Sequence, residues 1–355
     1  MVDSLSPLAT ALRSDRRLVV DEDAAQDLFW REGWTDGLPI VPPTEGKVMA
    51  FLAYSGLEPH QVVGVIAERH AEVAAEKLAI NAVMAGCLVE YFPVVVAAWS
   101  CLMADEYNLY SAAMSTSGGA PFVVVNGPVA KEIGMRFGSN ALGPGNRANA
   151  TIGRAIRLAL INLVGARGDF DRACLGHPGK YTFCIAEEET DSWEPLHVQR
   201  GFRRDQSAVS VVHLEGPEHV REGAAATPEQ LLRNYIDHVK TWNQGGAGVL
   251  IFNAEHRELL EGAGWSKTQV SAFVFEHSGR TIADLKRASR VRGELGPDDE
   301  STIVRWARSP QDFLIISAGG QGTFSAVIPP WAGGASTAPV TRAIPEPGCA
   351  SECFI

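Results

Sequence analysis

Five short, continuously apolar runs limit the fold of this chain more than any other feature of its sequence. Each run has the length of a strand buried on both faces, and segments with helical periodicity lie between the runs. The runs are PFVVVNG from Pro121, KYTFCIA from Lys180, AVSVVHL from Ala208, GVLIFN from Gly248 and DFLIISA from Asp312. Thr227, Asn253 and Ser266 are expected to cap three of the later helices. We therefore predict an α/β fold with a mixed or mostly parallel sheet flanked by helices, arranged in one lobe or two.

Changes in composition along the chain suggest its domain organisation. Periodicity is lost and charge is high between residues 191 and 207, which favours a boundary there. After Pro329 the sequence becomes rich in Pro, Gly, Ala, Ser and Thr, as in an irregular segment. We predict an N-terminal arm at 1–20, a helix-rich α/β lobe at 21–195, a second α/β lobe at 196–329 and an irregular C-terminal tail at 330–355.

The chain is acidic, with 42 Asp and Glu residues against 31 Lys and Arg residues and a formal net charge of −11 at pH 7. Such a surface repels phosphate backbones and anionic lipids, so neither nucleic acid nor a membrane is an expected partner. The first twenty residues lack a signal-peptide pattern, and no apolar run approaches the ~20 residues of a membrane span. We expect a cytoplasmic protein whose six cysteines are reduced.

The segment GPGNRANATIGRAIRLALINLVG, from Gly143, is the strongest candidate for a binding site. It predicts a helix over roughly 148–164, with apolar residues on one face and Arg147 and Arg154 on the other. Glycines before a helix let the backbone approach an anion closely, and the free N–H groups of the first turn favour one. The segment therefore predicts a carboxylate or phosphate site. An ordinary amphipathic helix with solvated arginines is the alternative.

A second glycine-rich segment follows the run DFLIISA. Gly319 and Gly320 come directly after a predicted strand, where loops of α/β proteins bind ligands. These glycines either wrap a ligand or form the turn of a hairpin, in which glycine supplies a positive φ.

A cation, an imidazole and a thiol fall within HPGKYTFCIAEEE, from His177. Strand alternation would place Lys180, Thr182 and Cys184 on one face. A nearby cation lowers a thiol pKa, so this element suits thiol or acid–base chemistry. Alternatively Cys184 is a small buried hydrophobic residue, and the same alternative applies to Cys87 on an apolar helix.

Two cysteines, Cys349 and Cys353, lie four residues apart in PGCASECFI. This spacing allows a reversible disulfide, or two metal ligands on one helical turn. On an extended tail the pair would act as a dithiol that visits a buried site and then an external reductant. Two incidental exposed cysteines are the alternative.

Several motifs resemble a family of bacterial proteins associated with small selenocysteine- or cysteine-containing UGSC proteins. They are WTDGLPIVPPT, KLAINAVMAGC, NRANATIGRAIRL, HPGKYTFCIAE and WEPLHVQRGF. The resemblance covers roughly residues 27–344 and is suggestive of the glycine and sarcosine reductase selenoproteins. It implies thiol or selenol redox chemistry with a small thiol or selenol protein as a separate partner. The residues to which it draws attention are Cys87, Asn146, Arg147, Asn149, Arg154, His177, Lys180 and Cys184.

Together these features predict one subunit of a thiol-dependent redox enzyme or lyase that acts on a small anionic substrate, a carboxylate or a phosphate. The predicted roles are anion binding by Arg147 and Arg154, thiol chemistry by Cys87 or Cys184, and proton transfer by His177 or Lys180. Two alternatives stay open: a metal-dependent enzyme whose cysteines act with His177 or His197, and a non-catalytic scaffold or ligand-binding subunit. The sequence identifies no particular cofactor or metal, and we expect an oligomer.

Overall fold

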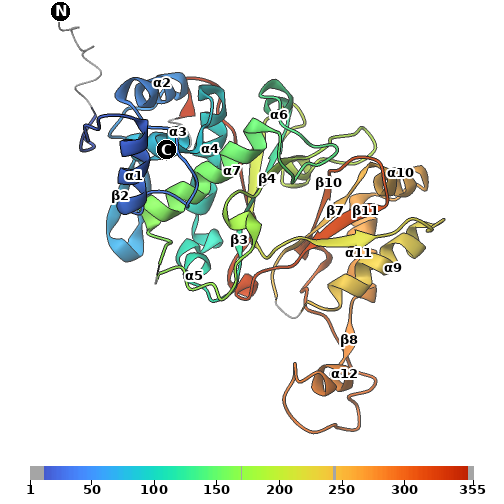
Figure 1. The fold of residues 1–355 in the computed structure, drawn as a ribbon. Helices are drawn as coiled ribbons and strands as arrows, with labels where there is room; N and C mark the ends of the chain where they lie inside the picture. Colours follow the sequence, from blue (N-terminus) through green and yellow to red (C-terminus); the bar gives the residue numbers. More distant parts are fainter. Residues whose placement is uncertain (1–11, 169, 243–244, 351–355) are drawn as a thin grey trace, which may run out of the picture.

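The computed structural model describes residues 12–350 except 169, 243 and 244, and these residues form four layers (Figure 1). Two four-stranded sheets pack face to face, and helices cover the outer face of each sheet. The prediction of an α/β fold with a mixed sheet flanked by helices is confirmed, with two sheets in the sandwich. Each sheet has helices on one face and the other sheet on its second face.

The first sheet has the strand order β12-β5-β3-β4, and the second has the order β10-β7-β11-β6. The strands are β3 (Ala120–Asn126), β4 (Cys184–Ala186), β5 (Ala208–Leu214), β6 (Glu218–Arg221), β7 (Gly248–Phe252), β10 (Phe313–Ser317), β11 (Phe324–Ile328) and β12 (Val340–Ala343). In each sheet one pair, β3–β4 or β7–β10, is parallel, and the other two described pairs are antiparallel. The alternative of mostly parallel sheets is therefore wrong. A connection as short as 318–323 cannot carry the chain back along the sheet, as another parallel strand would require.

Side chains alternate between the two faces of each strand, which explains why the runs are apolar throughout. Val123 and Val125 of β3 face the helices of the first sheet, whereas Phe122 and Val124 face the second sheet. Strands β7 and β10 follow the same pattern between the first sheet and their own helices. A single apolar interface between the two sheets thus buries the inner face of each.

Helices form the two outer layers and several smaller additions. They are α1 (Glu22–Arg31), α2 (Glu45–Ser55), α3 (Ala75–Ala85), α4 (Phe92–Leu102), α5 (Leu109–Ala113), α6 (Pro128–Glu132) and α7 (Arg147–Ala159) on the side of the first sheet, then α8 (Leu196–Gln199), α9 (Pro228–Val239), α10 (Ala254–Gly262), α11 (Lys267–His277) and α12 (Ile282–Arg287). Two hairpins complete the fold: β1 (Val62–Ile66) with β2 (Ala71–Ala74), and β8 (Arg280–Thr281) with β9 (Ile303–Val304). Among the described residues, no helix has both the length and the apolar character needed to cross a bilayer.

The expected helix caps are confirmed. The side chains of Thr227, Asn253 and Ser266 each accept a hydrogen bond from a backbone N–H three residues further along the chain. The Gln269 side chain in turn accepts a hydrogen bond from the Ser266 N–H, which completes a capping box.

The glycine-rich loop after β10 is a crossing and not the turn of a hairpin. Strands β10 and β11 lie on opposite sides of β7, so residues 318–323 must pass over the end of β7. Gly319 and Gly322 have φ values of +112° and +139°, which other residues rarely adopt. Asn253 Nδ2, at the end of β7, donates to the Gly322 carbonyl at 2.6 Å and holds the loop in place.

The predicted lobes do not coincide with the two sheets. The first sheet combines β3 and β4, from the predicted 21–195 lobe, with β5 from the 196–329 lobe and β12 from the 330–355 tail. The predicted irregular tail therefore contains a regular strand. Composition did not reveal that one sheet combines strands from three predicted segments, because this arrangement depends on pairing between strands that are distant in the sequence.

The predicted strand KYTFCIA is shorter than expected. β4 begins at Cys184, and residues 178–180 form a 3₁₀ turn. Pro178 has no N–H to donate to a sheet, and its fixed φ suits the first position of such a turn. The expectation that Lys180, Thr182 and Cys184 share one strand face is therefore wrong.

One buried carboxylate, Glu187, joins the two sheets at the carboxyl ends of their parallel strands. Its Oε2 accepts hydrogen bonds from Asn126 Nδ2 and from the Leu196 N–H, both at 2.7 Å. Its Oε1 accepts from the Ser317 N–H at 3.4 Å and forms an ion pair with Lys267. The side chains of Lys267 and Glu187 are only 2% and 1% exposed. Segments β3, α8, α11 and β10 are thus all tied to the end of β4.

Replacing Lys267 by methionine should lower the free energy of unfolding by about 3–5 kcal/mol, because the Glu187 carboxylate would stay buried without its counter-charge. Denaturant unfolding at neutral pH measures the loss. The double variant Lys267→Met/Glu187→Gln should recover part of it. As a control, Arg203→Met breaks a pair with Asp205 whose side chains are 69% and 74% exposed, and it should cost little. Equal losses in the two single variants would contradict the role of Glu187.

Candidate functional site

Asn146 and Asn149 hold the start of α7 against the glycine-rich loop that precedes it. Asn146 Oδ1 accepts from the Asn149 N–H at 3.0 Å, and Asn146 Nδ2 donates to the Gly134 carbonyl at 2.8 Å. The buried Asn149 amide accepts from the Arg136 N–H at 3.0 Å and donates to the Arg136 carbonyl at 2.8 Å. Both amides therefore shape the loop that the sequence predicted to bind an anion.

The two glycine-rich loops meet each other directly. The Gly319 N–H donates to the Phe137 carbonyl at 2.7 Å. A Cβ on Gly320 would lie 1.9 Å from Ser139 Oγ, so a larger residue does not fit. In this structure Gly319 and Gly320 serve close packing between two segments of backbone.

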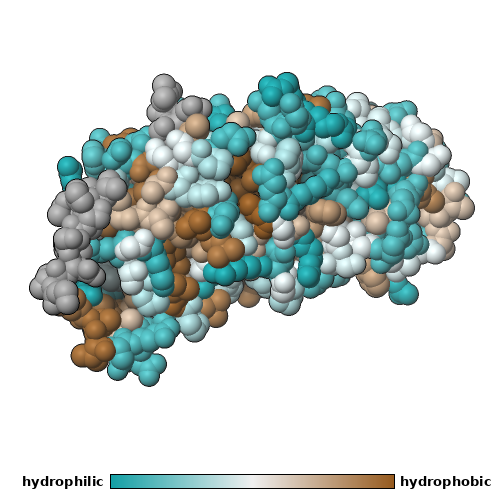
Figure 2. All heavy atoms as spheres, turned by 90° about the horizontal axis from the view of Figure 1, so that it is seen from above, coloured by the Kyte–Doolittle hydropathy of each residue, from teal (hydrophilic) through white to brown (hydrophobic). Residues whose placement is uncertain are grey.

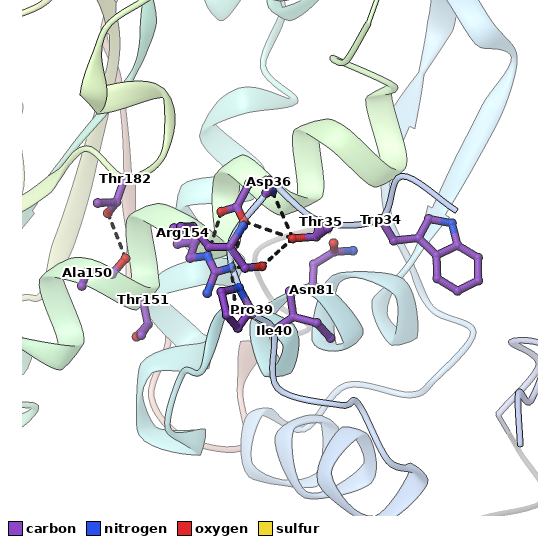
Figure 3. Close-up of polar contacts among 12 residues, drawn as sticks. Trp34, Thr35, Asp36, Pro39, Ile40, Asn81, Ala150, Thr151, Arg154 and Thr182 are labelled. Carbon is purple, nitrogen blue, oxygen red and sulfur yellow. Dashed lines mark hydrogen bonds and ion pairs between the residues drawn. The ribbon is translucent and has the colours of Figure 1, made fainter. Parts of the chain in front are cut away.

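Arg154 clamps the 34–40 loop, which carries most of the WTDGLPIVPPT motif, onto α7 (Figure 3). Its Nε and Nη2 donate to the two carboxylate oxygens of Asp36, each at 2.8 Å, and Nη2 also donates to the Pro39 carbonyl at 2.9 Å. The Asp36 side chain is 3% exposed. Burial acts to raise the pKa of Asp36, but the hydrogen bonds and charge of Arg154 outweigh burial and hold that pKa below its ordinary value. The arginine expected to hold a substrate thus holds a loop of the protein itself.

Arg147, the second arginine of the predicted anion site, lies at the exposed start of α7. Its Nε donates to the Gly86 carbonyl at 3.0 Å. Gly86 ends α3 and has a φ of +88°, so this contact joins the end of α3 to the start of α7. Arg147 and Arg154 are therefore engaged by different parts of the protein.

The two candidate catalytic thiols, Cys87 and Cys184, are both buried. Cys87 Sγ donates to the Thr151 carbonyl at 3.3 Å. Burial raises the pKa of Cys87 to about 12, although the hydrogen bond to Thr151 and the charges of Arg147 and Arg154 act to lower it. Burial also raises the pKa of Cys184, and the neighbouring Cys87 raises it further. Both thiols are protonated at neutral pH, and their thiolate chemistry stays a prediction.

His177 and Lys180 belong to a separate cluster that precedes β4. Lys180 Nζ and Arg157 Nη2 bind the two carboxylate oxygens of Asp171, each at 2.8 Å. Burial lowers the pKa of His177, the Leu214 carbonyl acts to raise it, and the charge of Lys180 lowers it. The net shift is downward, so the His177 imidazole is neutral at pH 7. Proton transfer by His177 or Lys180 stays a prediction.

The structure gives little support to the predicted dithiol of Cys349 and Cys353 or to the predicted metal site. Cys349 is half-buried beside the end of α2, where the Gly348 N–H donates to the Tyr54 carbonyl at 2.8 Å. Cys353 lies outside the described residues, so the dithiol stays a prediction. His197 is fully buried, with Nδ1 3.6 Å from a Glu189 oxygen. Within the described part of the chain, no three His, Cys, Asp or Glu side chains are grouped so that they could hold a metal ion.

A cavity of about 790 Å³ opens in the helix-rich half of the molecule, and sequence reasoning did not single it out. Its walls include α1, α3, the helical turn that follows α7 and the extended residues 12–19. Figure 2 shows apolar side chains gathered over this half of the surface. The apolar residues that line the cavity include Leu28, Phe29, Trp34, Ile80, Met84 and Leu163. Its volume lies within the range of small-molecule sites.

Three segments that are distant in the sequence meet at one wall of this cavity. Asn162 Nδ2 donates to the Trp34 carbonyl at 3.0 Å and to Asn81 Oδ1 at 2.7 Å. Trp34 begins the WTDGLPIVPPT motif, Asn81 lies in KLAINAVMAGC, and Asn162 follows NRANATIGRAIRL. Figure 3 labels Trp34 and Asn81, and it shows the Trp34 ring turned away from Arg154. Asn162 belongs to a π-helical turn, Leu160–Val164, that continues α7, and such turns recur at functional sites. A lone amide within an apolar helix is the sequence signal that could have revealed Asn81 and Asn162.

Charged groups also line the cavity, and several of them already form hydrogen bonds or ion pairs within the protein. Glu76 accepts a hydrogen bond from the Arg13 N–H at 2.9 Å, and Arg16 forms an ion pair with Glu45. Lys77 lines the cavity from α3, is exposed, and forms no salt bridge with the described residues. Lys77 is therefore a cation that an incoming anion can use.

Comparisons of the chain with protein-family models, with curated proteins and with solved structures found no match. The resemblance to the UGSC-associated family therefore stays a prediction, and the function of the cavity rests on its geometry.

Replacing Asp36 by asparagine should lower stability at pH 7 and flatten the dependence of stability on pH in the acid range. The pKa of Asp36 is lower in the folded protein than in the unfolded chain. The contribution of Asp36 to the free energy of unfolding is therefore present above about pH 4, and it is lost as the pH falls through the folded-state pKa. Urea unfolding at a series of pH values measures both effects. Arg154→Met should destabilise similarly, and the double variant should lose less than the sum, whereas strictly additive losses would contradict the pairing.

Thiol labelling of the native protein should modify Cys174 before the other described cysteines, because Cys174 is exposed whereas Cys87, Cys101 and Cys184 are buried. Alkylation at neutral pH followed by peptide mass spectrometry measures the order. The unfolded protein is the control, in which all six cysteines should react. Rapid labelling of Cys87 in the native state would contradict its burial and would favour the thiol chemistry expected from the sequence.

Proposed function

We propose that the protein binds a small organic anion with an apolar body in the 790 Å³ cavity. The observation that carries this proposal is the meeting of Trp34, Asn81 and Asn162, from three separate segments, at one cavity wall. Apolar lining residues favour a hydrocarbon or aromatic body in the ligand. The Lys77 ammonium favours a carboxylate or phosphate at its end, since charge-assisted hydrogen bonds are stronger than neutral ones.

A thiol-dependent reductase or lyase reaction on the bound anion is the second candidate. Cys87 comes three residues after Met84, which lines the cavity, and lies just beyond the Gly86 cap of that helix. The charges of Arg147 and Arg154 act to lower the pKa of Cys87 against the effect of burial. These cations favour the thiolate form whenever a movement of the chain admits water or ligand to Cys87.

Calorimetric titration with a series of aryl and alkyl carboxylates, and with their uncharged amides, tests the binding function. The acids should bind and the matched amides should bind more weakly, because the amides lose the contact with Lys77. Lys77→Met should weaken binding of the acids by about 1.5–3 kcal/mol, the range for hydrogen bonds to charged groups. Lys131→Met, an exposed change on α6 outside the cavity lining, is the matched control and should leave binding unchanged.

A second variant tests the volume of the site. Ile80→Trp should block the cavity and abolish binding, while thermal unfolding shows whether the variant is folded. Equal affinity in wild type, Lys77→Met and Ile80→Trp would show that the ligand binds elsewhere. Cys87→Ser should leave binding intact in all cases, and it should abolish turnover if the thiol reaction is correct.

A further inference from the structure

Residues 12–19, which we call the strap, form one wall of the 790 Å³ cavity, and all eight of them line it. The strap belongs to no helix or strand. Leu12 packs against the helical core, but Arg13 and residues 15–19 are exposed, so apolar burial holds little of the strap in place. A segment with so few buried contacts opens at a lower free-energy cost than the elements beneath it.

One buried carboxylate, that of Glu76, latches the strap to α3. Glu76 is 3% exposed. Its Oε2 accepts a hydrogen bond from the Arg13 N–H at 2.9 Å, and its Oε1 accepts from the Ser14 N–H at 2.5 Å and from the Ser14 hydroxyl.

The other contacts of the strap are weaker. The side chains of the Arg16–Glu45 ion pair are 56% and 34% exposed, and exposed pairs contribute little to stability. Among the described residues, no hydrogen bond between backbone groups joins the strap to the rest of the chain. The closed position of the strap therefore depends mainly on Glu76.

Charges around the cavity favour an anion beneath the strap. The whole chain carries −11, whereas the residues that line the cavity include five Lys or Arg and four Asp or Glu. Three of these five cations, Arg13, Arg16 and Arg17, belong to the strap. A locally basic mouth on an acidic protein attracts a small anion.

The latch and the proposed anion site share the first turn of α3. This helix begins at Ala75, and Lys77 directly follows Glu76. An anion bound to Lys77 therefore lies within one helical turn of the carboxylate that holds the strap. We infer that the strap is a clasp, which opens by losing its contacts with Glu76, admits the organic anion and closes over it again. This inference rests on the proposed function and describes how the same site is controlled.

Stopped-flow fluorescence with anilinonaphthalene sulfonate, an organic anion with an aromatic body, tests the clasp. Glu76→Ala should release this probe about 10-fold faster than wild type or more, because lost hydrogen bonds to a charged group shift the opening equilibrium by that factor. Glu45→Ala removes only the exposed ion pair and should have a small effect. Only the signal that Ile80→Trp abolishes is counted as binding in the cavity.

Glu132→Ala is the matched control, because Glu132 is exposed on α6 and outside the cavity lining. This variant should release the probe at the wild-type rate. A chain that lacks residues 1–19 provides a second test should Glu76→Ala fail to fold, and thermal unfolding shows whether each variant is folded. The shortened chain should also release the probe faster. Wild-type release rates in the folded variants would overturn the clasp.

Hydrogen exchange of the free protein separates the clasp from the choice of ligand. The Arg13 and Ser14 amides should exchange faster than the amides of α3, and Glu76→Ala should accelerate them without affecting α3. Bound probe should slow them. Equal exchange rates in the strap and α3 would show that the strap opens only when the protein unfolds, and would overturn the clasp. Faster exchange in the strap without any binding of the probe would support the opening strap and overturn the proposed ligand instead.

Discussion

The Glu187 carboxylate is the interaction on which the relative placement of the two sheets depends. The interface between the sheets is apolar, and the hydrophobic effect is not directional. Hydrophobic burial alone would therefore not fix the position of one sheet relative to the other. Glu187 removes this freedom, because it binds Asn126 and Ser317 at the ends of strands that belong to different sheets. The buried Lys267 supplies the counter-charge that makes a carboxylate tolerable there.

The chain follows the same path in both sheets. The polar groups at the ends of the parallel strands hold the sheets together, and the cavity lies elsewhere. From β3 it runs to the parallel β4 and then to β5 on the opposite side of β3, and β7, β10 and β11 repeat this route. The carboxyl ends of both parallel pairs meet around Glu187, where charged and amide groups bind one another. The cavity lies instead within the outer helical layer of the first sheet, between α1, α3, the π-helical turn after α7 and the 12–19 segment.

Sequence patterns predicted the features that neighbouring residues decide, and they missed those that distant residues decide. The cap at Asn253 is local and was predicted correctly. The continuous apolar runs showed that each strand is covered on both faces, but they could not show whether a helix or a second sheet covers it. Arg154 was predicted to hold a substrate anion because its actual partner, Asp36, lies 118 residues away in the sequence. The cavity wall at Asn162 was missed for the same reason, since its partners belong to other segments.

The place of β12 at the edge of the first sheet has a consequence for how the protein is made. β12 pairs with β5 across a wide separation in the chain, with Val340 opposite Val211. During synthesis, every strand of the second sheet leaves the ribosome before the first sheet receives its fourth strand. The edge of β5 must therefore wait unpaired while the other half of the sandwich folds. That open edge is where a chaperone, or another nascent chain, would meet this protein first.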